Sequence, residues 1–357
     1  MSPITTTSPS PPTLLLLPHL PPSALLPTLT PHLTSLPANT RVYLALPAPF
    51  QTSNRVTSFP AASKLFAETY AAIFQLSLRE KLIETLDIIV VLTSEDAPDG
   101  ASVVGPVVKE RILRDAAWAR VVEAEKAPLE ETEVVKQQPS GEIVVDVGRG
   151  GQHRVVAVGG TFDHLHLGHR LLLSMTTYAL SPYADAAEST RKKKIVVGVS
   201  GDSLLANKKH SAYLESWRDR VEATLAFLIS SLSPLPSGPA AAVVDSTAQV
   251  LAPDAKMFQS GRCVTATLPN GVIIECLELF EPCGPTITDP EITTLVVTEE
   301  TAAGGKFVND TRKGKELREL VILMVGLVGG EGAEKLSSTD LRKREGEEKG
   351  RRRESKA

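Results

Sequence analysis

The sequence predicts an α/β protein in which a domain built on a doubly wound parallel sheet follows a smaller α/β module. Over residues 147–345, short β-branched runs alternate with amphipathic helical stretches, a pattern typical of parallel sheets with helices on both faces. A shorter alternation of the same kind occupies residues 41–118. Because ligands of such sheets lie beyond the carboxyl ends of the strands, residues that follow a strand are the first candidates for chemistry.

Hydrophobic spacing defines the elements of the larger domain. β-branched runs bounded by polar or glycine residues predict strands, and apolar residues three and four positions apart predict helices. We expect strands at 154–158, 194–199, 272–279 and 293–298, and helices at 168–180, 214–232 and 313–328. Residues 346–357 form a basic tail, which we expect to be solvated and disordered.

The amino-terminal part of the chain carries no recognisable chemistry. Residues 1–40 are rich in Pro, Ser, Thr and Leu, a composition that predicts a disordered leader. The module at 41–118 has a strand-like run at 42–46, helical spacing over 60–85 and a buried strand at 86–92, and the sequence does not indicate its role or its partners. Residues 119–146 are predicted to be an acidic linker.

Composition limits the function classes. The formal net charge of −4 argues against nucleic-acid binding by the protein as a whole. The three cysteines form no CxxC pair, which fits a reducing compartment and offers no metal framework. No run reaches the roughly 18 apolar residues that a membrane span needs, and no basic segment precedes Arg41 as a signal peptide would require. We therefore expect a cytoplasmic protein that binds neither nucleic acid nor membrane.

Four of the seven histidines lie between residues 153 and 169, and three of them follow the strand predicted at 154–158. Gly159 and Gly160 let the backbone approach a ligand there, and a helix is expected to begin near Gly168. Free N–H groups at a helix start attract phosphate, and imidazoles such as His166 and His169 can donate hydrogen bonds to phosphate oxygens. This segment therefore favours phosphate chemistry.

Two other interpretations of the histidines stay open from the residues alone. His164, His166 and His169 have a spacing similar to the HxHxDH metal ligands of some hydrolases, although Gly168 stands where that set has aspartate. The histidines could also be incidental surface residues of a loop. The Gly-Gly-Thr-Phe-Asp string directly after a strand favours phosphate chemistry over both.

The string GGTFDHLHLGH at 159–169 resembles the (H/T)xGH signature of the adenylyl/cytidylyl transferase superfamily of nucleotidyltransferases. It is more narrowly similar to the eukaryotic-type, fungal-like, monofunctional pantetheine-phosphate adenylyltransferases. Three further blocks follow in that family's order: VGVSGD through LLANKK to RVE at 197–222, GPT through VVTEET to GG at 284–305, and LSSTDLR at 336–342. The resemblance covers roughly residues 152–345 and implies a Rossmann-like catalytic domain.

The resemblance implies that the 4′-phosphate of phosphopantetheine attacks the α-phosphorus of ATP, giving dephospho-CoA and pyrophosphate in coenzyme A biosynthesis. His169 would stabilise the α-phosphoryl charge with His166 beside it, and Lys208 and Thr161 would orient the nucleophile. Mg²⁺ would be held mainly by the ATP phosphates. The resemblance further implies ATP contacts by His169 and by Gly160, Phe162, Gly168, Thr301, Asn309, Arg312, Ser337, Ser338, Thr339 and Arg342.

Rival functions come from the same superfamily and from outside it. Nicotinamide-nucleotide adenylyltransferases share the SSTxxR block, and cytidylyltransferases share the histidine signature, whereas the LLxNKK and EET–GG blocks favour the pantetheine branch. A non-enzymatic nucleotide-binding scaffold, with residues 41–118 as its interaction surface, is the alternative outside enzymology. The intact His166, Gly168, His169 and Lys208 argue against it.

Two expectations concern the extent of the activity. The only Gly-Lys pairs, at 305–306 and 314–315, are followed by Phe and Glu, so neither fits the P-loop of a kinase. We expect the protein to stop at dephospho-CoA. Because every chemical block lies within residues 145–345, we also expect that fragment to retain catalysis alone.

Overall fold

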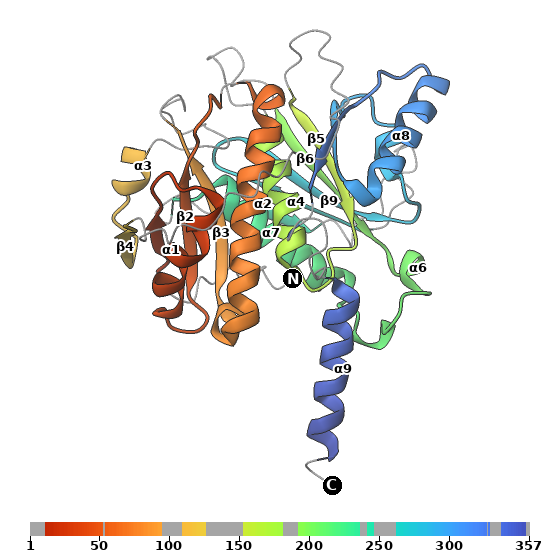
Figure 1. Ribbon diagram of the computed structural model, residues 1–357. Helices are drawn as coiled ribbons and strands as arrows, with labels where there is room; N and C mark the ends of the chain where they lie inside the picture. The colour runs from red at the N-terminus through yellow and green to blue at the C-terminus, as the bar shows by residue number, and fades with distance from the viewer. Residues whose placement is uncertain are drawn as a thin grey trace.

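The computed structural model of the protein describes residues 11–52, 54–94, 109–125, 153–180, 192–235, 241–245, 262–326, 328 and 337–354. These residues form two sheets, one of four strands and one of seven. Three helices lie between the sheets (Figure 1): α2 (Arg55–Arg79), α4 (Leu167–Ala179) and α7 (Trp217–Leu232). The predicted α/β class is confirmed.

The seven-stranded sheet has the strand order β11-β10-β5-β6-β9-β8-β7. Its strands are β5 (Val155–Gly160), β6 (Lys193–Ser200), β7 (Ala242–Asp245), β8 (Cys263–Thr267), β9 (Val272–Leu279), β10 (Thr294–Thr298) and β11 (Val321–Val325). The strands from β11 to β9 are parallel, and β7 and β8 extend the edge as antiparallel strands. The strand order reverses between β5 and β10, which makes the gap beyond their carboxyl ends the expected ligand site.

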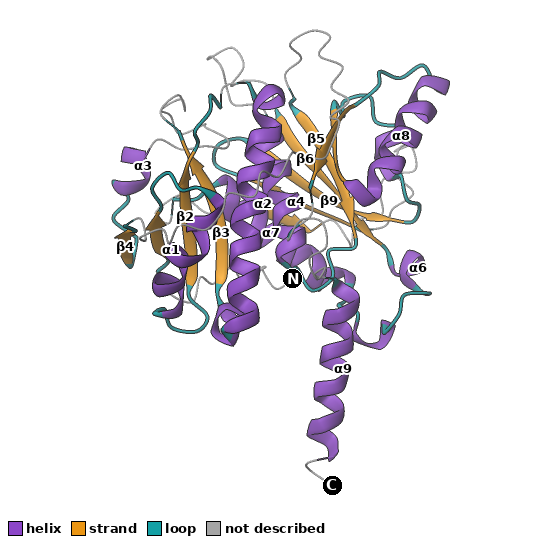
Figure 2. Cartoon of the chain, in the orientation of Figure 1, coloured by secondary structure: helices purple, strands orange, loops and turns teal. Residues whose placement is uncertain are grey.

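Alternating side chains cover the two faces of this sheet. Val156 and Val158 of β5 join a core cluster with α4 and α7, whereas Val155 and Ala157 join a second cluster with Val308 of α8 (Ala302–Gly314). Figure 2 shows α8 on the face of the sheet opposite α4 and α7. Because successive strand residues point to opposite faces, the apolar runs of the sequence are buried on both sides.

Two sequence predictions for this sheet are wrong. The helix predicted at 313–328 is instead the end of α8 followed by β11, whose five apolar residues pair in parallel with β10. The periodicity of a short apolar run fits a helix as well as a strand. Pairing with β10 makes this run a strand. The sheet is also mixed and not wholly parallel, because β7 and β8 run antiparallel at its edge. Neither of these two strands was predicted.

The four-stranded sheet lies in the amino-terminal module and has the order β3-β2-β1-β4, with all pairs parallel. Its elements are β1 (Thr13–Leu16), α1 (Pro22–Thr34), β2 (Arg41–Pro47), α2, the 3-10 turn η1 (Lys81–Thr85), β3 (Asp87–Thr93), α3 (Lys109–Leu113) and β4 (Arg120–Glu123). Strands β2 and β3 and helix α2 agree with the predicted elements of the 41–118 module.

The disordered leader predicted for residues 1–40 is wrong from residue 11 onward, and residues 1–10 lie outside the described part. β1 pairs on both sides and is buried in the middle of its sheet. In α1, Leu25, Leu29 and Leu33 are buried at four-residue spacing, while Pro27 and Pro31 lie on the exposed face. The leucines supply enough buried apolar surface to outweigh the helix-breaking composition.

Two further segments differ from expectation. Residues 120–123 of the predicted acidic linker form β4, and residues 126–146 lie outside the described part. Residues 346–354 of the predicted basic tail belong to α9 (Ser338–Glu354), which extends away from the rest of the molecule (Figure 1), and residues 355–357 lie outside the described part. Its polar composition explains that position, because the helix has little apolar surface to bury.

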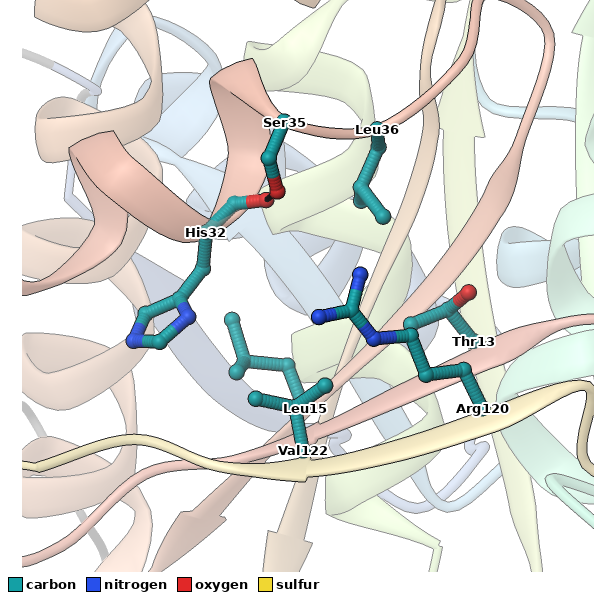
Figure 3. A pocket seen from close by; sticks show the side chains of 7 residues that line it. All are labelled: Thr13, Leu15, His32, Ser35, Leu36, Arg120 and Val122. Atoms are coloured by element: carbon teal, nitrogen blue, oxygen red, sulfur yellow. Dashed lines mark hydrogen bonds between the residues drawn. The ribbon is translucent and has the colours of Figure 1, made fainter.

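A small surface pocket lies in the amino-terminal module (Figure 3), lined by Thr13, Leu15, His32, Ser35, Leu36, Arg120 and Val122. Thr13 and Arg120 are the first residues of β1 and β4. The pocket therefore reaches the amino ends of these strands, the edge opposite to that at which parallel sheets bind ligands. Among the described helices, none is both long enough and apolar enough to cross a membrane.

Candidate functional site

Residues 159–169, which comprise the end of β5, the turn after it and the start of α4, lie where the strand order of the seven-stranded sheet reverses. Phe162 and His164 have positive φ values of 52° and 46°, so the chain turns sharply there. The Phe162 ring is completely buried beneath the turn, and a Cβ on Gly160 would lie only 3.0 Å from it. Because Gly160 has no side chain, it leaves room for the Phe162 ring beneath the turn.

The two histidines predicted to meet phosphate stack on one another. The ring centroids of His166 and His169 are 3.9 Å apart, with 20° between the ring planes. A Cβ on Gly168 would lie 3.1 Å from the His166 ring, closer than most real contacts. The HxGH spacing thus has a steric reason: glycine lets the first imidazole fold back over the helix start and reach the second.

One ring nitrogen of His169 differs from the other polar groups of this segment. Its Nδ1 atom is buried and has no hydrogen-bond partner among the residues that the structure describes. Burial lowers the pKa of His169 well below its usual range, and the neighbouring His166 lowers it further. The imidazole is therefore neutral near pH 7, with one ring N–H to donate.

The start of α4 adds further donors. His166 occupies the N-cap position, and its side chain makes no capping hydrogen bond to the first turn. The first N–H groups of a helix have no partner within the helix. Together with the helix dipole, they favour an anion beside the two imidazoles.

His164 takes no part in this pair. Its backbone N–H donates to Glu215 Oε2 at 2.6 Å, and its Nε2 lies 2.9 Å from the carbonyl oxygen of Tyr213. Two of the three histidines in the HxHxxH spacing therefore stack at the helix start, while the third fastens the turn to the segment before α7. Within the described residues, no three metal-binding side chains gather.

The serine and threonine hydroxyls at the start of α9, which were predicted to contact the ATP phosphates, each have a protein partner. Ser337 accepts from the Thr339 N–H at 3.1 Å, Ser338 donates to the Asp163 carbonyl at 3.0 Å, and Thr339 accepts from Arg342 at 3.1 Å. The Ser338 contact joins two segments 175 residues apart in the sequence, whereas the other two lie within the start of α9.

Arg342, expected to add charge to the ATP site, is almost completely buried and forms an ion pair with the buried carboxylate of Asp163. It also donates to the Lys209 carbonyl at 3.1 Å. Its charge is therefore balanced within the protein, and its role in this structure is to hold α9 and the lysine segment against the turn. Lys208 itself is exposed beside that anchor.

The site residues predicted beyond β10 are also engaged in the framework. Thr301 accepts from the Thr298 N–H at 3.0 Å in a capping box, and Asn309 exchanges two hydrogen bonds with Leu320. The buried Arg312 donates to the carbonyl oxygens of Thr286 and Asp289, at 2.7 and 2.9 Å. Ligand contacts by these three residues remain predictions.

Sequence reasoning assigned no role to Arg220. This fully buried side chain of α7 donates to the Thr161 and Ser200 carbonyls, both at 2.9 Å, and so ties the ends of β5 and β6 together. Its helical spacing with Trp217 and Thr224 places it on the buried face of α7. An arginine at such a position is the signal that could have identified it.

Comparisons with known proteins agree with these motifs over part of the chain. No protein-family model matches it. It is 31% identical over 193 residues to the phosphopantetheine adenylyltransferase of Saccharomyces cerevisiae, covering 53% of this chain and 48% of the relative. It is 30% identical over 200 residues to an uncharacterized protein of Schizosaccharomyces pombe, covering 56% and 48%. The chain thus spans about half the length of these two relatives.

Shorter archaeal proteins match more completely but less closely. The phosphopantetheine adenylyltransferase of Methanopyrus kandleri is 25% identical over 189 residues, which are 53% of this chain and 88% of that protein. A solved structure of a protein with unknown function from Archaeoglobus fulgidus covers 51% of this chain and 95% of that one, at 19% identity and a TM-score of 0.30, too low to support an argument. Over about half of its length, this chain is a distant homologue of phosphopantetheine adenylyltransferases.

Proposed function

We propose that the protein transfers the adenylyl group of ATP to 4′-phosphopantetheine, forming dephospho-CoA and releasing pyrophosphate. The observation that carries this proposal is the stacked His166–His169 pair at the uncapped start of α4, where the strand order reverses. The distant homology to proteins named phosphopantetheine adenylyltransferase supports the choice of substrates.

In the proposed reaction, a phosphate oxygen of phosphopantetheine forms a bond to the α-phosphorus of ATP, and the bond to pyrophosphate breaks. Catalysis of such a transfer rests on positioning and on stabilising charge, so no covalent intermediate with the protein is needed. His169 and the N–H groups of α4 would stabilise the negative charge on the α-phosphoryl oxygens. Lys208 is next to Lys209, whose carbonyl oxygen accepts a hydrogen bond from Arg342. Its charge would attract the phosphate of phosphopantetheine.

Mg²⁺ fits this site when it is bound to the nucleotide phosphates rather than to side chains of the turn. The one carboxylate of the turn, Asp163, accepts from the Glu215 N–H and pairs with Arg342, so both of its oxygens already have protein partners. Mg²⁺ commonly keeps several waters and binds substrate phosphates. It would therefore neutralise phosphate charge while held mainly by ATP.

The test is to incubate the full chain with ATP, Mg²⁺ and 4′-phosphopantetheine, measure pyrophosphate release and identify the product by mass spectrometry. We expect dephospho-CoA, with no turnover when nicotinamide mononucleotide replaces phosphopantetheine or when CTP replaces ATP. His169→Gln is the matched control for contaminating enzymes. Turnover with nicotinamide mononucleotide alone, or nucleotide binding without pyrophosphate release, would contradict the proposal.

A further inference from the structure

The amino-terminal module packs directly on the helix that carries His166 and His169. Its longest helix, α2, lies against α4. The Ser58 and Tyr178 hydroxyls are 2.6 Å apart, and those of Tyr70 and Ser174 are 3.1 Å apart. One cluster of buried apolar side chains includes residues of both halves, so no polar boundary divides the module from the candidate catalytic domain.

Arg170 provides a charged link at the first turn of α4. It directly follows His169, and its Nη1 donates to Asp87 Oδ1 and to the Ile88 carbonyl, both at 2.9 Å. Asp87 and Ile88 are the first two residues of β3 in the amino-terminal module. The Arg170 guanidinium also lies 5.3 Å from the ring centre of Phe227 on α7, so two other elements, β3 and α7, fix its position.

Asp87 is itself held in place. Its second oxygen, Oδ2, accepts from Arg41 Nε at 2.7 Å, so the carboxylate bridges β2 of the module and α4. Although burial raises the pKa of Asp87, Arg170 and Arg41 outweigh burial and leave the pKa below its usual range. The carboxylate is therefore ionised at neutral pH, and its charge-assisted bonds are stronger than neutral ones.

We infer that Asp87 and Arg170 are positioning residues, through which the amino-terminal module sets the placement of the His166–His169 pair. The inference rests on the proposed function of that pair. Because Arg170 and His169 are consecutive on one rigid turn, a bond that fixes the Arg170 side chain resists rotation and sliding of the imidazole. An arginine fork can satisfy a carboxylate and a carbonyl together, whereas lysine offers a point charge with less fixed geometry.

This inference changes the expectation for residues 145–345 alone. That fragment would lack Asp87 and the whole of α2, and the aromatic contact between Phe59 and Tyr178 would be lost with them. An exposed apolar face on α4 favours misfolding or aggregation. The amino-terminal module is therefore a structural part of the candidate active site and not a separable appendage.

The experiment compares full-length Asp87→Asn, Arg170→Met and Arg170→Lys with wild type in the adenylyl-transfer assay. We expect kcat to fall by about tenfold to hundredfold in the first two, because small displacements of catalytic groups are costly. The KM values should stay within about threefold, because the ligand-binding groups remain present. Arg170→Lys should recover part of kcat.

The matched control is Glu123→Gln, which removes an exposed 2.9 Å ion pair with Lys109 in the same module, remote from α4. It should leave kcat and KM unchanged. If Arg170→Met and Asp87→Asn keep kcat within a factor of about two of wild type, or raise KM with kcat intact, the positioning role is wrong.

A second measurement does not depend on turnover. In protein with carbon-13-labelled histidine, the imidazole resonances of His166 and His169 can be assigned from single His→Gln variants. We expect Arg170→Met and Asp87→Asn to shift these two resonances and to leave exposed His19 unchanged. Unmoved resonances would contradict positioning even in variants of reduced stability. If wild type makes no dephospho-CoA but the resonances shift, the proposed function fails while the positioning role stands.

Discussion

The histidines at the end of the turn, residues 166–169, and the start of α9, residues 337–342, were both predicted from sequence to contact ATP. They differ in whether their polar groups have hydrogen-bond partners within the protein. At the turn, a buried ring nitrogen of His169 has no hydrogen-bond partner in the described part of the chain. At the helix start, all three hydroxyls and the Arg342 guanidinium bond to protein atoms. Polar residues that the sequence assigned to one site therefore differ in whether the protein itself satisfies their hydrogen bonds.

The physical distinction is the cost of leaving a polar group unsatisfied. A buried donor or acceptor without a partner costs about 1–3 kcal/mol, so proteins keep few of them. The open position at His169 is consistent with a site that a ligand completes. The bonded segment at 337–342 instead holds α9 and the Lys209 carbonyl against the turn.

The largest expected effect is on stability and comes from Arg342→Met. It would leave the fully buried Asp163 carboxylate without its charged partner, and breaking a buried pair in this way costs about 3–5 kcal/mol. Urea denaturation should show this loss, and the exposed Arg344→Met on the same helix should stay within about 0.5 kcal/mol of wild type. Equal stability of the two variants, with a raised KM for ATP in Arg342→Met alone, would make Arg342 a phosphate ligand.

His169→Ala should have the opposite profile. Loss of one donor to the developing phosphoryl charge should lower kcat by about 10²–10³, or roughly 2.7–4 kcal/mol. The fold should persist, because the described structure has no hydrogen bond to Nδ1 that the change would break. Saturating kinetics and circular dichroism, with His19→Ala as the control, measure both effects. Turnover within about tenfold of wild type would remove His169 from the mechanism.

The lowered pKa of His169 also predicts a pH dependence of stability. An unfolded histidine titrates near pH 6.5, whereas the folded imidazole resists protonation until lower pH. Below about pH 6.5 the unfolded state binds a proton that the folded state does not. The free energy of unfolding therefore decreases as the pH is lowered. Below about pH 6.5, wild type should lose stability more steeply than His169→Gln, by at most about 1.4 kcal/mol per pH unit. Urea curves that shift in parallel for the two proteins would show that His169 is not held neutral.

The smallest effect is expected from Gly168→Ala. The new methyl would meet the His166 ring at 3.1 Å and push it by a few tenths of an ångström from its stack on His169. We expect kcat to fall by about threefold to tenfold, without loss of stability, because alanine favours the helix. The control is Gly314→Ala in α8, where an added Cβ meets nothing within 4 Å. Unchanged kcat in Gly168→Ala would show that the stacking geometry is not needed for turnover.

The sequence by itself predicted the α/β class and most of the elements that carry the site. Strand β9 was predicted with the bounds that it has, and α4 within one residue at each end. These elements have strong local signals: β-branched runs for the strands and three- and four-residue spacing for the helix. His166 and His169 are three positions apart at the start of α4, and this helical spacing brings the two side chains together.

Only the tertiary structure decided which polar residues are left for a ligand. Arg342 and Asp163 are 179 residues apart, and no local pattern indicates that they form an ion pair. The strand β11, the order of β1 within its sheet, and the contact of Arg170 with Asp87 likewise depend on partners distant in sequence. Local spacing fixes the face on which a side chain lies, whereas its hydrogen-bond partner depends on what the rest of the chain packs against that face.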